Sequence, residues 1–241
     1  MDVSIIITSY NYDQYIEEAI NSCLDQKTQF SFEVIIVDDG SKDNTREILS
    51  KYSKYCTIKL IENSGVEVAS NIGVRASLAP CFVRLDADDS LKMDFIEKIY
   101  PVFQSSNSNF IFSNYDLIDK DSGLINSMNL PAYSHQEILN RGDFLASGTI
   151  VEKRVFDLLG GYNETSRNSG LENYELILQF LSRGYHGLLL NENLFNYRTH
   201  ASNMSKERRS SIVKYGKALF KKEGYGKFST NDYHPYGLKL I

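Results

Sequence analysis

The sequence lacks the features that would assign it to a membrane or secreted class. No apolar run approaches the roughly 20 residues that a membrane-spanning helix needs. The chain opens on an apolar segment at residues 3–7, without the basic segment and cleavage site of a signal peptide. Its three cysteines, Cys23, Cys56 and Cys81, are odd in number and have no CxxC spacing, as is typical of reduced thiols. We therefore expect a cytoplasmic protein.

Glycine loops that cradle phosphate groups are also absent. Neither GxGxxG nor GxxxxGK[ST] occurs, which excludes the common dinucleotide-binding and ATP-binding signatures. The net charge of −5, from 31 acidic and 26 basic side chains, argues against a general nucleic-acid binder. If the chain binds a diphosphate, the charge of that group must be neutralised in another way.

The first part of the chain alternates between two kinds of pattern. Apolar, β-branched segments at residues 3–7, 33–37, 57–61 and 81–85 predict strands, and helical periodicity follows each of the first three. This alternation predicts an α/β fold, with a mostly parallel, Rossmann-like central sheet flanked by helices. Ligands bind beyond the carboxyl ends of the strands in such sheets.

The second part has a mixed pattern. We expect helices at residues 91–103, 138–144, 171–182 and 205–222, and strands at 109–113, 115–119, 124–127, 148–151, 187–190 and 194–197. The strands predict a small mixed second sheet. Because no Pro/Gly-rich linker separates the parts, we expect one domain over residues 1–225. Its parts are 1–90, 91–204 and a basic helix at 205–225, followed by a tail at 226–241.

The fourth predicted strand ends in three carboxylates, Asp86, Asp88 and Asp89. Like charges this close raise one another's pKa and repel unless a cation lies among them. Oxygen ligands of this kind suit Mg²⁺ or Mn²⁺. A loop of solvated acids that caps the next helix is the alternative. A metal at Asp86-Ala87-Asp88 would also neutralise a diphosphate in the absence of a glycine loop.

Polar residues follow the other predicted strands as well. They are Thr8-Ser9-Tyr10, Asp38-Asp39-Gly40-Ser41 and Asn63-Ser64-Gly65. We expect all of them to line one crevice with the acidic turn, because parallel strands end at the same edge of the sheet. A carboxylate after the second strand can accept hydrogen bonds from a nucleobase N–H and a ribose hydroxyl. An ordinary strand-to-helix turn is the alternative.

Several segments resemble the family 2 glycosyltransferases of the GT-A fold. They are residues 4–11, 35–45, 63–65, 69–73 and 85–89, then Gly148-Thr149-Ile150, Gly160-Gly161-Tyr162, residues 171–176 and Tyr197-Arg198-Thr199-His200. The resemblance covers nearly the whole chain in the order of the family and weakens after about residue 205. It implies inverting, metal-dependent transfer of a hexosyl or N-acetylhexosaminyl group from a nucleotide-diphosphate sugar to a hydroxyl. UDP is the commonest donor nucleotide among similar proteins. The acceptor would be a carbohydrate or a lipid-linked glycan in bacterial-type surface polysaccharide synthesis.

The resemblance also implies residue roles. Residues 1–90 would form a nucleotide-binding half and 91–204 an acceptor half. Nucleotide contacts would come from Thr8, Tyr10, Asp38, Asp39, Asn71, Asp86 and Ala87. Asp88 would bind Mn²⁺ or Mg²⁺, with His200 as a further metal ligand or diphosphate contact; a surface-loop histidine is the alternative. The donor sugar and acceptor would lie near Gly148, Gly160, Gly161 and Arg198, although the glycines are also explained by turn chemistry.

The motif that carries the general base departs from the family. Members typically have Glu-Asp, and the Asp deprotonates the acceptor, whereas this chain has Glu172-Asn173. Either Glu172 serves as the base, or the acceptor needs little activation, or the protein is impaired. We favour an active enzyme that uses Glu172. A sugar-nucleotide-binding protein without activity and a sugar-phosphate nucleotidyltransferase are the rival functions; the second would need a glycine-rich basic loop after the first strand.

The predicted helix at residues 205–222 is strongly basic. It carries one acid, Glu207, against Lys206, Arg208, Arg209, Lys214, Lys217, Lys221 and Lys222. Such a helix could lie on an anionic membrane surface near a lipid-linked acceptor, at the inner face of the membrane. The alternative is a helix packed on the sheet with a solvated basic face.

Overall fold

The computed structural model describes residues 1–141 and 147–228. Strands and helices alternate through the first part of the chain. They are β1 (Val3–Ser9), α1 (Ile16–Leu24), β2 (Phe32–Asp38), α2 (Thr45–Ser50), β3 (Thr57–Leu60), α3 (Val66–Ala76) and β4 (Cys81–Asp86). All seven elements were expected from the sequence, and each strand agrees with its predicted range to within one residue at its first position and two at its last.

The second part is less regular. Its elements are β5 (Ser90–Leu91), α4 (Phe95–Ser105), β6 (Phe110–Ile118), β7 (Leu124–Met128), α5 (His135–Arg141), β8 (Ile150–Glu152), α6 (Lys153–Leu159), α7 (Glu172–Ser182), β9 (Gly187–Arg198), α8 (Met204–Glu207) and α9 (Arg209–Glu223). Residues 142–144 of the helix expected at 138–144, and residues 229–241 of the tail, lie outside the described residues.

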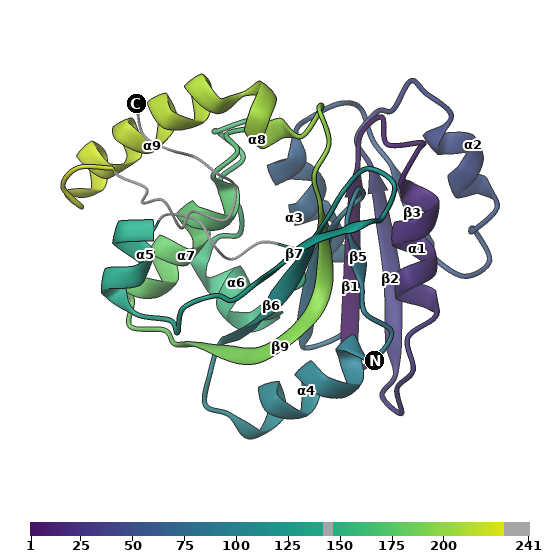
Figure 1. Cartoon of the computed structure of the whole chain (residues 1–241), viewed down its shortest axis with the longest axis horizontal. Helices are drawn as coiled ribbons and strands as arrows, with labels where there is room; N and C mark the ends of the chain where they lie inside the picture. Colours follow the sequence, from purple (N-terminus) through teal and green to yellow (C-terminus); the bar gives the residue numbers. More distant parts are fainter. Residues whose placement is uncertain (142–146, 229–241) are drawn as a thin grey trace.

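The strands form one sheet in the order β3-β2-β1-β4-β8-β6-β9-β5, and β7 pairs with β6 (Figure 1). Strands β1 to β4 are parallel to one another, which confirms the predicted Rossmann-like half. The small second sheet is not separate. Strand β8 runs antiparallel to both β4 and β6 and so joins the mixed strands to the parallel ones.

Four local predictions were wrong. The two strands expected at 109–113 and 115–119 are one strand, β6. The helix expected from residue 91 begins at Phe95, because Ser90 and Leu91 pair with β9. The two strands expected at 187–190 and 194–197 are one long strand, β9, whose pairing with β6 shifts in register near Asn114. The single helix expected at 205–222 is divided at Arg208 into α8 and α9.

Helices cover both faces of the sheet (Figure 1). On one face, Ile5 and Ile7 of β1 belong to a core shared with α1, α2 and α4. On the other face, Ile6 belongs to a core shared with α3, α6, α7 and α9. This alternation follows from the two-residue period of a strand. A strand buried on both faces explains the uninterrupted apolar run at the start of the chain.

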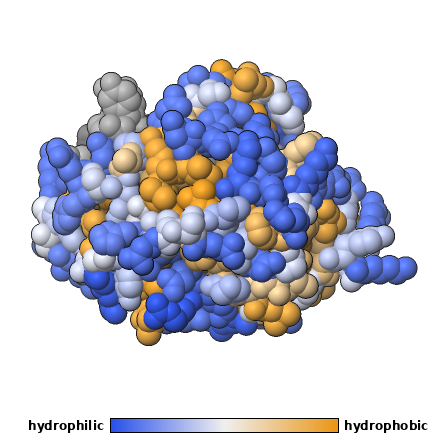
Figure 2. Space-filling view, turned by 90° about the horizontal axis from the view of Figure 1, so that it is seen from below, coloured by the Kyte–Doolittle hydropathy of each residue, from blue (hydrophilic) through white to orange (hydrophobic). Residues whose placement is uncertain are grey.

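Over residues 1–141 and 147–228, no helix combines the length and the apolar character needed to cross a membrane. The face seen from below is largely hydrophilic around a hydrophobic patch near its middle (Figure 2). Elsewhere, exposed apolar side chains are dispersed over separate elements, such as Leu60 on β3, Leu124 on β7 and Leu158 on α6.

Candidate active site

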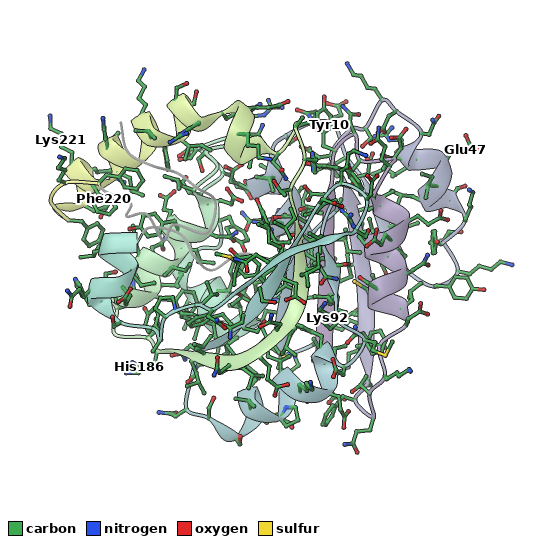
Figure 3. The ribbon with its side chains drawn as sticks, in the orientation of Figure 1. Tyr10, Glu47, Lys92, His186, Phe220 and Lys221 are labelled. Atoms are coloured by element: carbon green, nitrogen blue, oxygen red, sulfur yellow. The ribbon has the colours of Figure 1, made fainter. Side chains whose placement is uncertain are left out.

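The neighbouring strands β2, β1 and β4 end at the same level. Thr8 of β1 lies opposite Asp86 of β4, and Ser9 lies opposite Asp38 of β2. A cavity of about 580 Å³ opens beyond these ends, near the labelled Tyr10 at the upper edge of the sheet (Figure 3). Its walls include residues that follow all four parallel strands: Thr8, Ser9, Tyr10, Asp39, Asn63, Asp86, Ala87 and Asp88. All four strand ends contribute to one crevice, as expected, but not every expected residue lines it; those that do not are Asp38, Gly40, Ser41, Ser64 and Gly65.

Asp39 organises the side of the cavity beyond β2 and β3. Its two carboxylate oxygens accept hydrogen bonds from the backbone N–H groups of Ser64 (2.6 Å) and Gly65 (2.9 Å). Gly65 has a φ of 101°, a conformation that side chains rarely adopt. Each carboxylate oxygen can accept more than one hydrogen bond, so Asp39 keeps capacity for a ligand.

Two expected nucleotide contacts do not line the cavity. Asp38 is fully buried, and its carboxylate accepts from Arg46 Nε at 2.6 Å. Asn71 turns away to the loop after α6, where its amide donates to the Tyr162 carbonyl at 2.9 Å and accepts from the Tyr162 N–H at 3.0 Å. Asp38 therefore joins β2 to α2, and Asn71 joins α3 to the loop after α6.

The acidic turn after β4 brings Asp88 and His200 together. His200 Nε2 lies 2.9 Å from Asp88 Oδ2, and Asn203 Nδ2 lies 3.3 Å from the same oxygen. Burial raises the pKa of Asp88, the hydrogen bond from His200 lowers it, and the charge of Asp86 raises it further. The His200 ring stacks on Tyr15 with centroids 5.1 Å apart, which fixes its orientation.

The charge balance of the cavity wall suits a divalent cation. Five carboxylates line it, those of Asp39, Asp86, Asp88, Glu172 and Glu207, against two guanidinium groups, those of Arg84 and Arg208. Such a wall would repel a diphosphate unless a cation came with it. No cluster of three or more His, Cys, Asp or Glu able to hold a metal occurs among the described residues. Asp88 lines the cavity, whereas His200 does not and directs its Nε2 at Asp88. A cation at Asp88 would need phosphate oxygens and water as its further ligands, as is usual for Mg²⁺.

Arg198 supports the acidic turn from behind and does not line the cavity. It is 1% exposed, and its Nε donates to the Asp88 carbonyl at 2.8 Å. Its backbone N–H donates to Asp89 Oδ1 at 2.9 Å, and its guanidinium pairs with Glu18 at 2.7 Å. A direct contact with donor or acceptor, which we expected, does not follow from this position.

The three expected sugar-site glycines also lie outside the cavity wall. Gly148, with a φ of 78°, donates its N–H to the Arg84 carbonyl at 3.0 Å, and a Cβ there would lie 2.8 Å from the Phe195 ring. Gly160 and Gly161 end α6 in the left-handed region. Close backbone approach and turn formation explain all three.

Arg84 is a site residue that the sequence interpretation missed. It lies on β4, is 6% exposed and donates to Asp86 Oδ1 at 2.7 Å. It also donates to Glu172 Oε1 at 3.1 Å and to Asn173 Oδ1 at 3.3 Å, at the start of α7. A charged residue in an otherwise apolar strand was the available signal. The two expected catalytic residues, Glu172 and Asn173, both line the cavity.

Glu172 is buried but keeps one oxygen unused. Burial raises the pKa of its carboxyl, and the charge of Arg84 partly offsets this. Among the described residues, Glu172 Oε2 has no hydrogen-bond partner. This oxygen is itself buried, although the residue lines the cavity. A buried carboxylate with a raised pKa in a cavity wall is suited to accept a proton. Glu175, one turn further on, instead bonds to Asn163 and Tyr215.

Residues of the C-terminal segment also line the cavity. Met204, Glu207, Arg208 and Ile212 line it, from α8 to the first turn of α9. Arg208 forms no ion pair within the described part of the chain and has a weak contact, 3.4 Å, to the Asn168 carbonyl. The apolar face of α9 packs into the core through Ile212, Leu219 and Phe220, so the packed-helix alternative describes this segment.

Comparisons with known proteins agree with this architecture. The model of glycosyl transferase family 2 matches residues 4–157. A putative teichuronic acid biosynthesis glycosyltransferase, TuaG of Bacillus subtilis, is 39% identical over 123 residues, 49% of this chain and 48% of that protein. Chondroitin synthase of Escherichia coli is 32% identical over 187 residues, 76% of this chain and 27% of that protein. The chain thus spans less than half the length of these relatives.

A solved structure supports the fold. The S. aureus TarS fragment 1–349 in complex with UDP-GlcNAc superposes with a TM-score of 0.72. The superposition covers 94% of this chain and 67% of that one, at 18% sequence identity. At this level of identity the likeness concerns the arrangement of helices and strands.

Proposed function

Because the chain belongs to glycosyltransferase family 2, we propose that it transfers a sugar from a UDP-sugar to a hydroxyl acceptor with inversion at the anomeric carbon. One observation carries the proposal. The Asp86-Ala87-Asp88 turn and Glu172 line the same cavity, so the leaving diphosphate and a carboxylate that can accept a proton would lie in one site. The relatives named for teichuronic acid and chondroitin, and the neighbour bound to UDP-GlcNAc, support a hexosyl or N-acetylhexosaminyl donor and a surface-polysaccharide product.

Donor binding is assigned to the strand ends. Thr8, Tyr10 and Asp39 would contact the nucleobase and Asp86 with Ala87 the ribose, since all five line the cavity. Asp38 and Asn71 have no part in this proposal except to support the wall. Residues 1–90 would form the nucleotide-binding half and 91–204 the acceptor half of a domain that ends near residue 225.

The diphosphate would lie between Asp88 and Arg208. Mn²⁺ or Mg²⁺ held by Asp88 and His200 would neutralise the departing diphosphate and so act as a Lewis acid. Arg208 also lines the cavity and has no carboxylate partner within the described part of the chain, so its guanidinium is available to a phosphate oxygen.

In the transfer step, the acceptor oxygen attacks the anomeric carbon from the side opposite the diphosphate. The new glycosidic bond forms as the bond to the diphosphate oxygen breaks. Glu172 takes the proton from the acceptor hydroxyl through Oε2, its oxygen without a hydrogen-bond partner among the described residues. That oxygen is buried in a residue that lines the cavity, so the acceptor must contact it directly. A single displacement inverts the anomeric configuration.

A donor screen tests this function. With Mn²⁺ and a panel of UDP-, GDP- and dTDP-sugars, we expect nucleotide release with at least one UDP-sugar, detected by mass spectrometry. EDTA should suppress it, and NMR of the product should show inverted configuration. Binding of UDP without turnover of any donor would instead favour an inactive sugar-nucleotide-binding protein, and a retained configuration would contradict the displacement step.

We also propose a cytoplasmic location and a contact with a membrane surface. The contact rests only on the positive charge of α9. Lys214, Lys217 and Lys221 are exposed at helical spacing on α9, and Lys221 points outward at the far end of the helix (Figure 3). Since the apolar face is buried in the protein, α9 cannot insert into lipid. Anionic lipids attract such residues by about 1 kcal/mol each.

Liposome flotation tests the membrane contact. The protein should float with vesicles that contain anionic lipid at low salt and be released at high salt, because the attraction is electrostatic. Lys217→Glu together with Lys221→Glu should weaken flotation, while Lys54→Glu, on the loop after α2, should not. Equal flotation of all variants would remove membrane contact from the proposal.

A further inference from the structure

We propose that Arg84 is a positioning residue that fixes Glu172 as the proton acceptor and ties it to Asp86 on the donor side, and that Asn173 supplies the neutral oxygen that completes this arrangement. The inference rests on the proposed function, in which Glu172 takes the acceptor proton. It accounts for the Asn at a position where the family typically has the base.

Arg84 connects two parts of the cavity that are far apart in sequence. One arm of its guanidinium donates to Asp86 Oδ1 at 2.7 Å, and the other donates to Glu172 Oε1 at 3.1 Å. The guanidinium is planar and rigid, so bonds to both arms fix the direction of both carboxylates. Because Glu172 Oε1 is engaged, Oε2 is the one of its two oxygens without a hydrogen-bond partner among the described residues. It is buried, so an acceptor hydroxyl would have to come into direct contact with it.

Arg84 also offsets the acidic surroundings of Glu172. Burial and the carboxylates of Glu67 on α3 and Asp86 on β4 all raise the pKa of Glu172. Arg84 lowers it, and the neutral Tyr162 hydroxyl and Asn173 amide complete the surroundings. Without the guanidinium, a buried Glu172 beside two acids would hold its proton to higher pH and could not act as a base there.

Asn173 is the third side chain that accepts a hydrogen bond from the Arg84 guanidinium. Its Oδ1 accepts from Arg84 Nη1 at 3.3 Å and from the Tyr162 hydroxyl at 3.2 Å. A guanidinium only donates, so the oxygen end of the amide must face it. The Arg84 guanidinium also lies over the Tyr162 ring, 5.6 Å from its centroid.

A carboxylate at position 173 would change the charge of this cluster. Arg84, Asp86 and Glu172 together carry a net charge of −1, and an Asp would make it −2 in a buried site. The third carboxylate would compete for one guanidinium and raise the pKa of Glu172. The amide makes the same hydrogen bonds without that charge. Asn173 is therefore a partner of the base and no disabled base itself.

Kinetics of Arg84→Met, Arg84→Lys and Asn173→Asp in the full chain test this inference. Arg84→Met should lower kcat about 10²-fold, because a misdirected base loses its alignment. The acid limb of its kcat/KM profile should move to higher pH. In Arg84→Lys the acid limb should lie between those of Arg84→Met and wild type, because Lys keeps the positive charge but lacks the two arms of the guanidinium. Asn173→Asp should lower kcat and also move the limb to higher pH.

Three outcomes would overturn the inference. The first is an Arg84→Met variant with wild-type kcat and pH profile. The second is an Asn173→Asp variant that gains activity and then tolerates Glu172→Gln, which would put the base at position 173. The third is an Arg84→Lys variant whose limb coincides with that of Arg84→Met. UDP binding and thermal denaturation establish that each variant is folded; if Arg84→Met is not, Arg84→Lys against wild type decides the limb position.

The proposed function fails by a different result. Wild-type protein that turns over no donor would overturn the function and this inference together. If the wild-type protein turns over a donor and the Arg84 and Asn173 variants have the same kcat and pH profile, only the inference is overturned.

Discussion

Asp88→Asn is expected to remove metal-dependent transfer and to lower kcat/KM by about 10³-fold or more, since Lewis-acid stabilisation is worth several kcal/mol. Asn keeps the volume of the side chain but loses the charge that a hard cation requires. The variant should also lose the Mn²⁺ dependence of UDP binding. Titration calorimetry with Mn²⁺ and with EDTA measures this without any turnover.

Asp121→Asn is a matched control for this change. Asp121 lies in the exposed turn between β6 and β7, where its carboxylate pairs only with Lys120 among the described residues. Its replacement should leave binding and transfer unchanged. If Asp88→Asn kept the wild-type Mn²⁺ dependence in both measurements, the cation would not be held at Asp88, and the charge argument for the acidic turn would fail.

The part of the cavity at the strand ends could be predicted from the sequence because it depends on local order. Alternating strands and helices specify parallel neighbours, and parallel neighbours end at one edge. Thr8 and Asp86 lie at the ends of β1 and β4, and Asp39 directly follows β2, so their meeting in one cavity required only the strand pattern. Asp38, next to Asp39, could not be separated from it in this way. Which of the two faces the cavity depends on the ion pair with Arg46.

The buried charges were beyond the sequence patterns because their partners are distant in the chain. Arg84 meets Glu172 across 88 positions, and Arg198 meets the Asp88 carbonyl across 110. A family motif placed Arg198 near the sugar, yet it lies beneath the acidic turn. Burying a guanidinium is unfavourable unless it is fully paired. Each of these residues therefore depends on three-dimensional neighbours that periodicity does not reveal.

The role of the C-terminal segment was hidden by its regular pattern. Helical spacing continues through Arg208, but the backbone there has φ −104° and ψ 13° and divides α8 from α9. The division allows Met204 and Ile212 to face the same cavity. The basic composition of this segment predicted only a charged surface. It could not predict that Arg208 lines the cavity, because composition does not specify where a side chain points.

Glu172→Gln is expected to lower kcat by about 10²–10⁴-fold, the usual contribution of a general base. Gln preserves the size of the side chain and can still accept from Arg84 through its amide oxygen, so UDP affinity should stay near that of wild type. The ionised form of Glu172 is required, and burial raises its pKa, so wild-type activity should fall as the pH drops through that raised value. The variant should lack this acid limb.

Glu175→Gln separates the loss of a base from the loss of an acid on α7. Glu175 accepts from Tyr215 at 2.7 Å and from Asn163 at 2.9 Å and does not line the cavity, so its replacement should leave kcat and the pH profile nearly unchanged. If Glu172→Gln kept wild-type kcat with its acid limb intact, the acceptor would need no base at this position. Since Arg84 joins Glu172 to Asp86, such a result would mean that the buried ion pair supports only the shape of the donor site.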